Sequence, residues 1–160
     1  DMMMTTRLTR LAILTALACV LRLTFGAFPN VKPITALFFV LILAYSLADA
    51  IVVSSLTMLV TGFLMGFSVI ILGQIISYAL ILSFGAFIFK WLKPMILRTL
   101  VVFVLTMFYG FIISMFSAQL FGSQFWPFWL SGLTFDLAHA VSTALFFPIL
   151  ATIFKNILKT

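Results

Sequence analysis

Charged residues are scarce in this chain of 160 residues: they make up 8% of it, and only three are acidic. A soluble domain carries about 25% charged and roughly 45–50% apolar residues, whereas this chain is 65% hydrophobic. A soluble fold of this length needs a more polar exterior than these residues supply. A lipid bilayer accepts an apolar exterior, so we expect an integral membrane protein.

Cysteine and histidine are also nearly absent, with one of each, Cys19 and His139. A single cysteine excludes an intrachain disulfide. A protein zinc site needs three or four ligands, so we predict neither a metal nor another cofactor. No Walker A sequence is present, so the chain does not hydrolyse ATP by that motif. We read the net charge of +6 as membrane topology rather than as a nucleic-acid-binding surface.

Long apolar runs fill most of the sequence, separated by glycine, proline and charge clusters. Each membrane crossing needs roughly 20 apolar residues, so six crossings use nearly all of the chain. We therefore predict an all-α integral membrane protein, a six-helix bundle forming one domain over residues 1–160. Residues 1–4 are expected to be a remnant ahead of the native start. The predicted helices cover residues 7–24, 34–46, 50–65, 69–89, 98–120 and 128–154.

The basic residues are distributed unevenly between the two sides that this topology creates. One side carries seven of them and the other only Arg22 and Lys32. Because lysine and arginine accumulate in cytoplasmic loops, we predict cytoplasmic termini and a multi-pass protein of the bacterial plasma membrane. The seven are Arg7, Arg10, Lys90, Lys93, Arg98, Lys155 and Lys159.

Ionisable side chains within apolar helices are expensive and usually face the protein interior. Asp136 and His139 lie three residues apart and share a helix face, and Arg22 is expected at similar depth. One interpretation is a structural Arg22–Asp136 ion pair with His139 hydrogen-bonded beside it. The other is that the three residues border a pocket that faces the outside.

Further polar and aromatic residues fall in the outer halves of the predicted helices and in the stiff loop at 26–33. Their clustering favours a small-molecule site. An intramembrane enzyme using Asp136 and His139, or a structural or pore-forming protein, are the alternatives, and we assign no catalytic residue. The predicted substrate-binding residues are Arg22, Asn30, Lys32, Gln74, Tyr78, Ser114, Trp126, Asp136 and His139.

Three segments resemble the substrate-binding S components of energy-coupling factor (ECF) transporters. Residues 10–16 read Arg-Leu-Ala-Ile-Leu-Thr-Ala, with small residues Ala12 and Ala16 one helical turn apart. Residues 28–36 read Phe-Pro-Asn-Val-Lys-Pro-Ile-Thr-Ala, and residues 135–143 read Phe-Asp-Leu-Ala-His-Ala-Val-Ser-Thr. The resemblance extends over essentially the whole chain and is closest to the subgroup assigned to cobalamin.

This resemblance implies a vitamin site near the outside and a complex with a transmembrane coupling subunit and two ATPases. Ala12 and Ala16 are then expected to contact the coupling subunit. A neutralised Arg22–Asp136 pair favours a large, nearly neutral ligand such as cobalamin. Pyridoxine or another vitamin precursor remains the alternative ligand.

Overall fold

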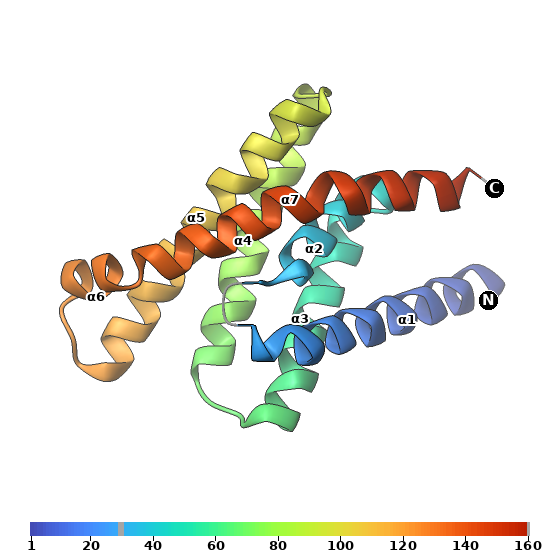
Figure 1. The fold of residues 1–160 in the computed structure, drawn as a ribbon. Coiled ribbons are helices and arrows are strands. Elements are labelled where there is room, and N and C mark those ends of the chain that lie inside the picture. Colours follow the sequence, from blue (N-terminus) through green and yellow to red (C-terminus); the bar gives the residue numbers. More distant parts are fainter. Residues whose placement is uncertain (29–30, 160) are drawn as a thin grey trace.

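The structure, a computed structural model, describes residues 1–28 and 31–159 and is all-helical over them. Its elements enclose one core and confirm the predicted all-α class (Figure 1). They are α1 (Met2–Thr24), the 3-10 helix η1 (Phe25–Ala27), α2 (Pro33–Ala44), α3 (Leu47–Met65), α4 (Ile70–Trp91), α5 (Met95–Phe121), α6 (Phe125–Ser131) and α7 (Leu133–Leu158).

Five helical segments among the described residues are long and apolar enough to cross a membrane: Met2–Ala27, α3, α4, α5 and α7. The remaining predicted crossing corresponds to α2, which has only 12 residues. At about 1.5 Å per residue it is roughly 18 Å long, shorter than the apolar thickness of about 30 Å. The structure thus supports a multi-pass membrane protein with five full-length candidate spans.

Helix α2 is the centre of the bundle. Nine of its 12 residues are buried, and it packs against α1, α3, α4, α5 and α7. Pro33 stands at its first turn, where a proline costs no hydrogen bond. Ser46 then caps α3 by accepting the Asp49 N–H at 3.1 Å. The prediction of two helices rather than one bent segment over residues 34–65 is therefore confirmed.

The last predicted helix, residues 128–154, is wrong as a single element. The chain forms α6 and α7, which are separated at Gly132. Pro127 lies in the first turn of α6, where its missing N–H is tolerated, so the helix begins at Phe125, ahead of the predicted start at residue 128. The short α6 lies beside the C-terminal end of α5 and the N-terminal end of α7 (Figure 1).

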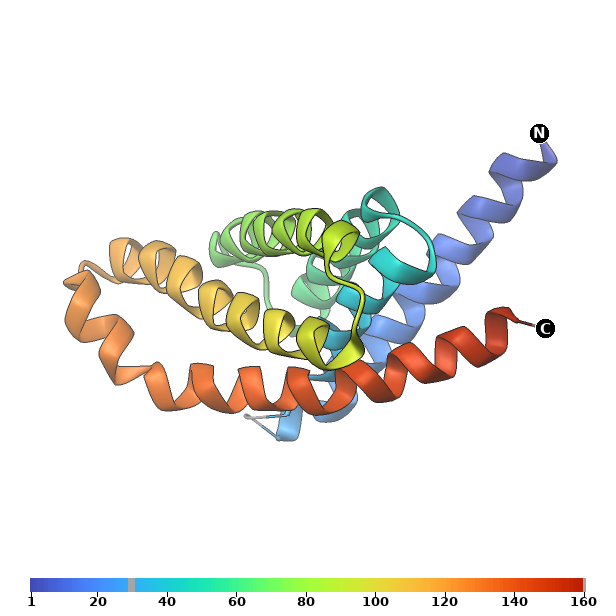
Figure 2. The same cartoon turned by 90° about the horizontal axis from the view of Figure 1, so that it is seen from above.

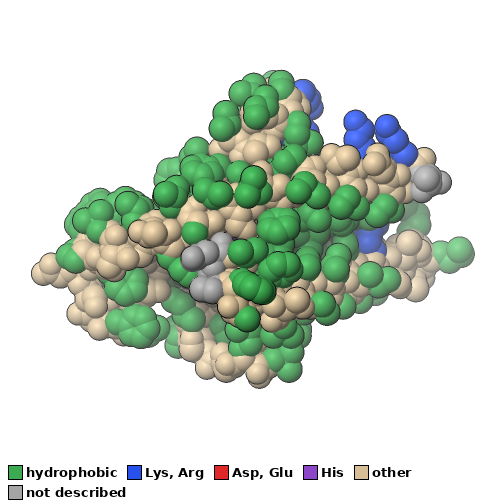
Figure 3. All heavy atoms as spheres, in the orientation of Figure 1, with side chains coloured by type: hydrophobic (Ala, Val, Ile, Leu, Met, Phe, Trp, Pro, Cys, Tyr) green, Lys and Arg blue, Asp and Glu red, His purple; other side chains and the backbone are tan. Residues whose placement is uncertain are grey.

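Both termini project from the same side of the molecule in two perpendicular views (Figure 1, Figure 2). On the face shown in Figure 3, basic side chains lie toward this end and the α4–α5 connection, and apolar side chains cover much of the rest. Four of the seven basic residues grouped by the sequence pattern line one hollow of about 550 Å3 between α2, α5 and α7. They are Lys93, Arg98, Lys155 and Lys159.

Candidate functional site

A cavity of about 310 Å3 lies where the end of α1 and the start of α2 meet α3, α4, α5 and α7. Phe28 and Met65 line it and are exposed, so it reaches the molecular surface. Its walls combine aromatic rings with a few polar groups, as small-molecule sites usually do. The lining residues are Leu21, Arg22, Phe25, Gly26, Phe28, Val31, Lys32, Pro33, Ile34, Met58, Met65, Gln74, Tyr78, Tyr109 and Phe135.

Two cations line this cavity. Arg22 stands in the last turn of α1, where a positive charge is favourable, and its Nη1 donates to Thr61 Oγ1 at 2.7 Å and Met58 Sδ at 3.0 Å. Lys32 lies in the connection before α2, and its Nζ stands 4.6 Å from the centre of the Phe135 ring. The Lys32 backbone N–H donates to Ser142 Oγ of α7 at 3.1 Å, which fixes this connection against the bundle.

The electrostatic surroundings of Lys32 disfavour its charged form. Its pKa is lowered to about 8, first by burial and then by the Arg22 guanidinium, while Asp136 opposes the shift more weakly. The ammonium is therefore mostly protonated at neutral pH and loses its proton within the mildly alkaline range. Two neighbouring cations, which Asp136 offsets only weakly and with which it forms no salt bridge among the described residues, leave this end of the cavity positive.

The predicted Arg22–Asp136 ion pair is absent. Among the described residues, the only salt bridges join Asp49 to Arg7 and Arg10. Asp136 instead packs against the backbone of α5: a Cβ at Gly110 would meet its carboxyl carbon at 2.3 Å. Its Oδ2 is buried without a hydrogen-bond partner. The pair fails because the carboxyl occupies the space left by a glycine on α5, which sequence spacing on α7 does not reveal.

His139 lies behind the cavity wall rather than on it. It is 3% exposed, and its Nε2 shares a hydrogen bond of 2.8 Å with Thr35 Oγ1. Thr35 Oγ1 also bonds the Tyr78 hydroxyl at 2.7 Å, and Tyr78 lines the cavity. The Tyr109 ring packs edge-on against His139, with centroids 5.6 Å apart. A continuous polar chain thus joins α7 through α2 to the cavity surface on α4.

Gln74 and Tyr78, both predicted to bind substrate, line the cavity together from one face of α4. The Gln74 Oε1 atom is buried and has no hydrogen-bond partner. Buried polar atoms are usually satisfied, so an unpaired acceptor at a cavity wall is available to a donor on a ligand. This is the uncharged polar group that the cavity presents to a guest molecule.

Ser114 and Trp126, two further predicted site residues, do not line the cavity. Ser114 is buried on α5, and Trp126 is exposed in an aromatic cluster on α6. Asn30 lies outside the described residues. Tyr109 and Thr35 were not predicted. A tyrosine in the middle of an apolar helix needs a partner for its hydroxyl, and that rule could have identified Tyr109.

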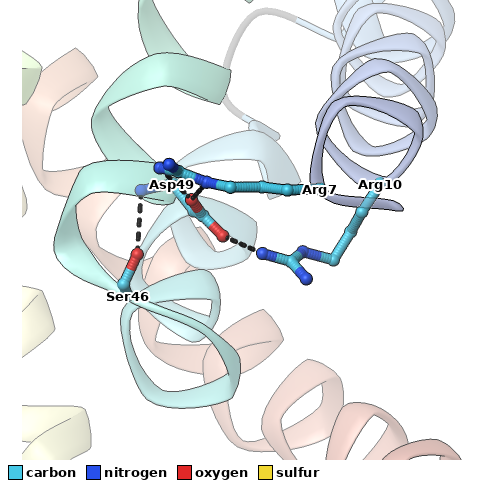
Figure 4. A network of polar contacts seen from close by, with 4 residues as sticks. All are labelled: Arg7, Arg10, Ser46 and Asp49. Atoms are coloured by element: carbon cyan, nitrogen blue, oxygen red, sulfur yellow. Dashed lines mark hydrogen bonds and ion pairs between the residues drawn. The ribbon is translucent and has the colours of Figure 1, made fainter. Parts of the chain in front are cut away.

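A second polar cluster joins α1 to α3 at the end of the molecule that carries the N-terminus (Figure 4). Asp49, which is 1% exposed, accepts hydrogen bonds from Arg7 Nε at 2.9 Å and from Arg10 Nη2 at 2.5 Å, and both arginines form salt bridges with it. The Arg10 guanidinium also stands 4.3 Å from the centre of the Tyr45 ring. The sequence pattern assigned both arginines to topology and missed the pair, although their spacing of three places them on one face.

Helix α1 presents its two small residues outward. Ala12 and Ala16 are exposed, while Leu11, Leu14 and Ala18 are buried against the bundle. A face with small residues one turn apart permits close approach of another helix. The geometry thus leaves the predicted docking positions accessible.

Within residues 1–28 and 31–159, no three metal-ligating side chains of His, Cys, Asp or Glu gather in one place. No family model, no curated protein and no solved structure matches the chain. The functional assignment therefore rests on the cavity and on the three sequence segments.

Proposed function

We propose that this protein is the substrate-capturing subunit of an ECF-type vitamin importer in the bacterial plasma membrane. The observation that carries the proposal is the cavity itself. It has a volume of about 310 Å3, aromatic walls and a few converging polar groups, and lies within an apolar helical bundle. Pockets of roughly 300–1,000 Å3 with this composition hold small molecules.

In this proposal α2 counts as the sixth crossing, shortened because neighbouring helices surround it. Both termini and the basic hollow lined by Lys93 and Lys159 face the cytoplasm, in keeping with the positive-inside rule. The cavity then faces the opposite side and captures its ligand from the medium. Ala12 and Ala16 form the face that meets a coupling subunit, and two ATPases drive the cycle.

The size of the cavity favours a small vitamin or vitamin precursor over cobalamin. Cobalamin, with its corrin ring and nucleotide loop, is larger than 310 Å3, so its binding requires the cavity mouth to widen. An intramembrane enzyme that uses Asp136 and His139 is less well supported, because neither residue lines the cavity. The importer subunit is therefore our conclusion, with a pyridoxine-sized ligand ahead of cobalamin.

The experiment is a binding assay with the purified chain and a panel of labelled vitamins that includes cobalamin and pyridoxine. A ligand that binds only the folded state raises the thermal midpoint by an amount set by its concentration relative to Kd. We expect one ligand to do so, and cells to accumulate it only when a coupling subunit and ATPases are co-expressed. Accumulation without those partners, or no binding across the panel, would overturn the proposal.

A further inference from the structure

We infer that the captured molecule is an anion: a small, ring-bearing carboxylate or phosphate monoester whose acid group lies between Arg22 and Lys32. This inference rests on the proposed capture function and adds the chemical class of the ligand. It reverses the expectation of a neutral site, which depended on an Arg22–Asp136 pair that the structure does not contain.

The distribution of carboxylates is the first argument. The chain has three acidic residues in all, so each can be located. Asp1 caps the start of α1, and Asp49 is held by Arg7 and Arg10. Asp136 packs against Gly110 and is not among the cavity-lining residues. No carboxylate therefore lines the cavity alongside its two cations.

The donor geometry is the second argument. In the described part of the chain, Arg22 donates only through Nη1, to Thr61 and Met58. A guanidinium carries five N–H donors, so Nε and Nη2 remain for a guest. Carboxylate and phosphate groups match this planar fork, and hydrogen bonds between ionised groups are roughly twice as strong as neutral ones. Thr61 thus orients the Arg22 guanidinium and leaves its Nε and Nη2 donors available to a ligand.

The cavity walls define the rest of the ligand. The Tyr78 and Tyr109 rings pack at an interplanar angle of 37° with centroids 4.5 Å apart, and Phe25 and Phe28 also line the cavity. Such walls favour an aromatic or other flat ring. Gln74 Oε1 offers an acceptor to a hydroxyl or amine on that ring. The cavity is thus positive at one end and aromatic and hydrogen-bonding elsewhere.

Lys32 makes this inference sensitive to pH. With a pKa of about 8, its ammonium loses its proton across the mildly alkaline range. The ionisable groups around it are Arg22 from α1, Asp136 and His139 from α7, and Tyr78 and Tyr109 from α4 and α5. Of the two cations that line the cavity, only Lys32 titrates near pH 8. Affinity for an anion should therefore fall as pH rises above 8.

The experiment compares matched ring-bearing pairs on the purified full-length chain: nicotinate with nicotinamide, and pyridoxal 5′-phosphate with pyridoxal. Binding is measured by calorimetry at pH 7. A charged hydrogen bond contributes about 1.5–3 kcal/mol, so the anionic member of the preferred pair should bind roughly 10- to 150-fold more tightly. The first pair tests a carboxylate and the second a phosphate.

Lys32→Gln should weaken binding of the preferred anion by a similar factor and leave binding of the matched neutral compound unchanged. Lys32→Arg should keep the affinity and remove the decline between pH 7 and 9.5, because arginine stays protonated. Lys93→Gln removes the same charge from the opposite end and serves as the matched control. The ligand-free thermal midpoint of each variant verifies folding independently.

The outcomes separate the two proposals. If the neutral members bind as tightly as the anions, the anion inference is wrong while capture stands. Anion binding that Lys32→Gln and Lys93→Gln leave unchanged would show that the acid group lies elsewhere. If neither the anionic nor the neutral compounds bind and cells accumulate none of them, the capture function fails, and the anion inference fails with it.

Discussion

The two arginine-containing clusters of this protein have opposite charge balances. At the end carrying the N-terminus, Arg7 and Arg10 share Asp49, a buried carboxylate (Figure 4). At the cavity, Arg22 and Lys32 are neighbours with no carboxylate in the lining. A buried ion pair stabilises an arrangement of helices once it is formed, whereas uncompensated cations beside a cavity favour an anionic guest. The comparison favours a structural role for the first cluster and is consistent with the binding role that we propose for the second.

Asp49→Asn is expected to give the largest loss of stability. It removes the carboxylate from two arginines and leaves charges without a partner at the α1–α3 contact. Breaking a fully buried pair costs about 3–5 kcal/mol, and the partial exposure of both arginines places the expected loss near the lower limit, about 3 kcal/mol. Thermal unfolding in detergent measures it. Asp1→Asn, at the exposed N-terminus, should be neutral, and equal effects of the two changes would contradict the structural role of Asp49.

Gly110→Ala tests whether Asp136 is held on α5, away from the cavity cations. The added Cβ would meet the carboxyl carbon at 2.3 Å, so one of the helices must move. Overpacking of this kind costs about 1–3 kcal/mol, and combining it with Asp136→Ala should recover part of the loss. Gly132→Ala is the control, since the nearest atoms to its Cβ are 3.8 Å away. Unchanged unfolding of Gly110→Ala would show that Asp136 is free to turn toward Arg22.

Thr35→Val interrupts the polar chain from His139 to Tyr78. The substitution keeps the volume but leaves two buried groups without their shared partner, which should cost about 1–3 kcal/mol. Thr106→Val is the matched control, because the Thr106 hydroxyl bonds only the Val102 carbonyl of its own helix. Denaturation of both variants in parallel measures the loss of unfolding free energy. A larger loss for Thr106→Val than for Thr35→Val would contradict a cooperative polar chain behind the cavity.

Lys32→Gln should raise the stability of the ligand-free protein, whereas Asp49→Asn should lower it. The effect of Lys32→Gln should also be smaller. Below its folded-state pKa of about 8 the protonated lysine is disfavoured in the folded protein, and above its free pKa of about 10.4 it is neutral in both states. Wild-type stability without ligand should therefore rise between pH 8 and 10. The Lys32→Gln variant should be more stable than the wild type at pH 7, by under about 1 kcal/mol. Its stability should not show the part of the rise between pH 8 and 10 that Lys32 causes. A less stable variant with an unchanged pH profile would show that the two cations do not repel.

Replacing Ala12 and Ala16 by leucine should change stability least. Both residues are exposed, so unfolding should shift by no more than about 0.5 kcal/mol. Copurification with a coupling subunit and uptake in cells should nevertheless fall, because the larger side chains prevent close helix approach. Val20→Leu, also exposed on α1, is the control. Uptake that survives the double substitution would place the docking face elsewhere.

Several features followed from the sequence because they depend on local pattern and composition. Long apolar runs predicted the membrane helices, and Pro33 marked where α2 begins. The start of α3 was predicted at residue 50, later than its actual start at Leu47, because the capping role of Ser46 was not recognised. The spacing of Gln74 and Tyr78 placed both on one face of α4, and both line the cavity. The start of α6 at Phe125 was missed because Pro127, in the first turn of that helix, resembles a loop signal.

The sequence by itself determined that the exterior of this protein suits a lipid bilayer. It also determined the small set of polar residues that the protein must bury. Composition fixes these, since a chain with so few charges has few ways to satisfy them. Which residues pair was decided only by the tertiary structure. Asp49 meets two arginines across 39 and 42 positions of sequence, and Asp136 occupies the space over Gly110 instead of reaching Arg22. Such choices depend on how closely helices approach, and helix periodicity within one segment carries no information about that distance.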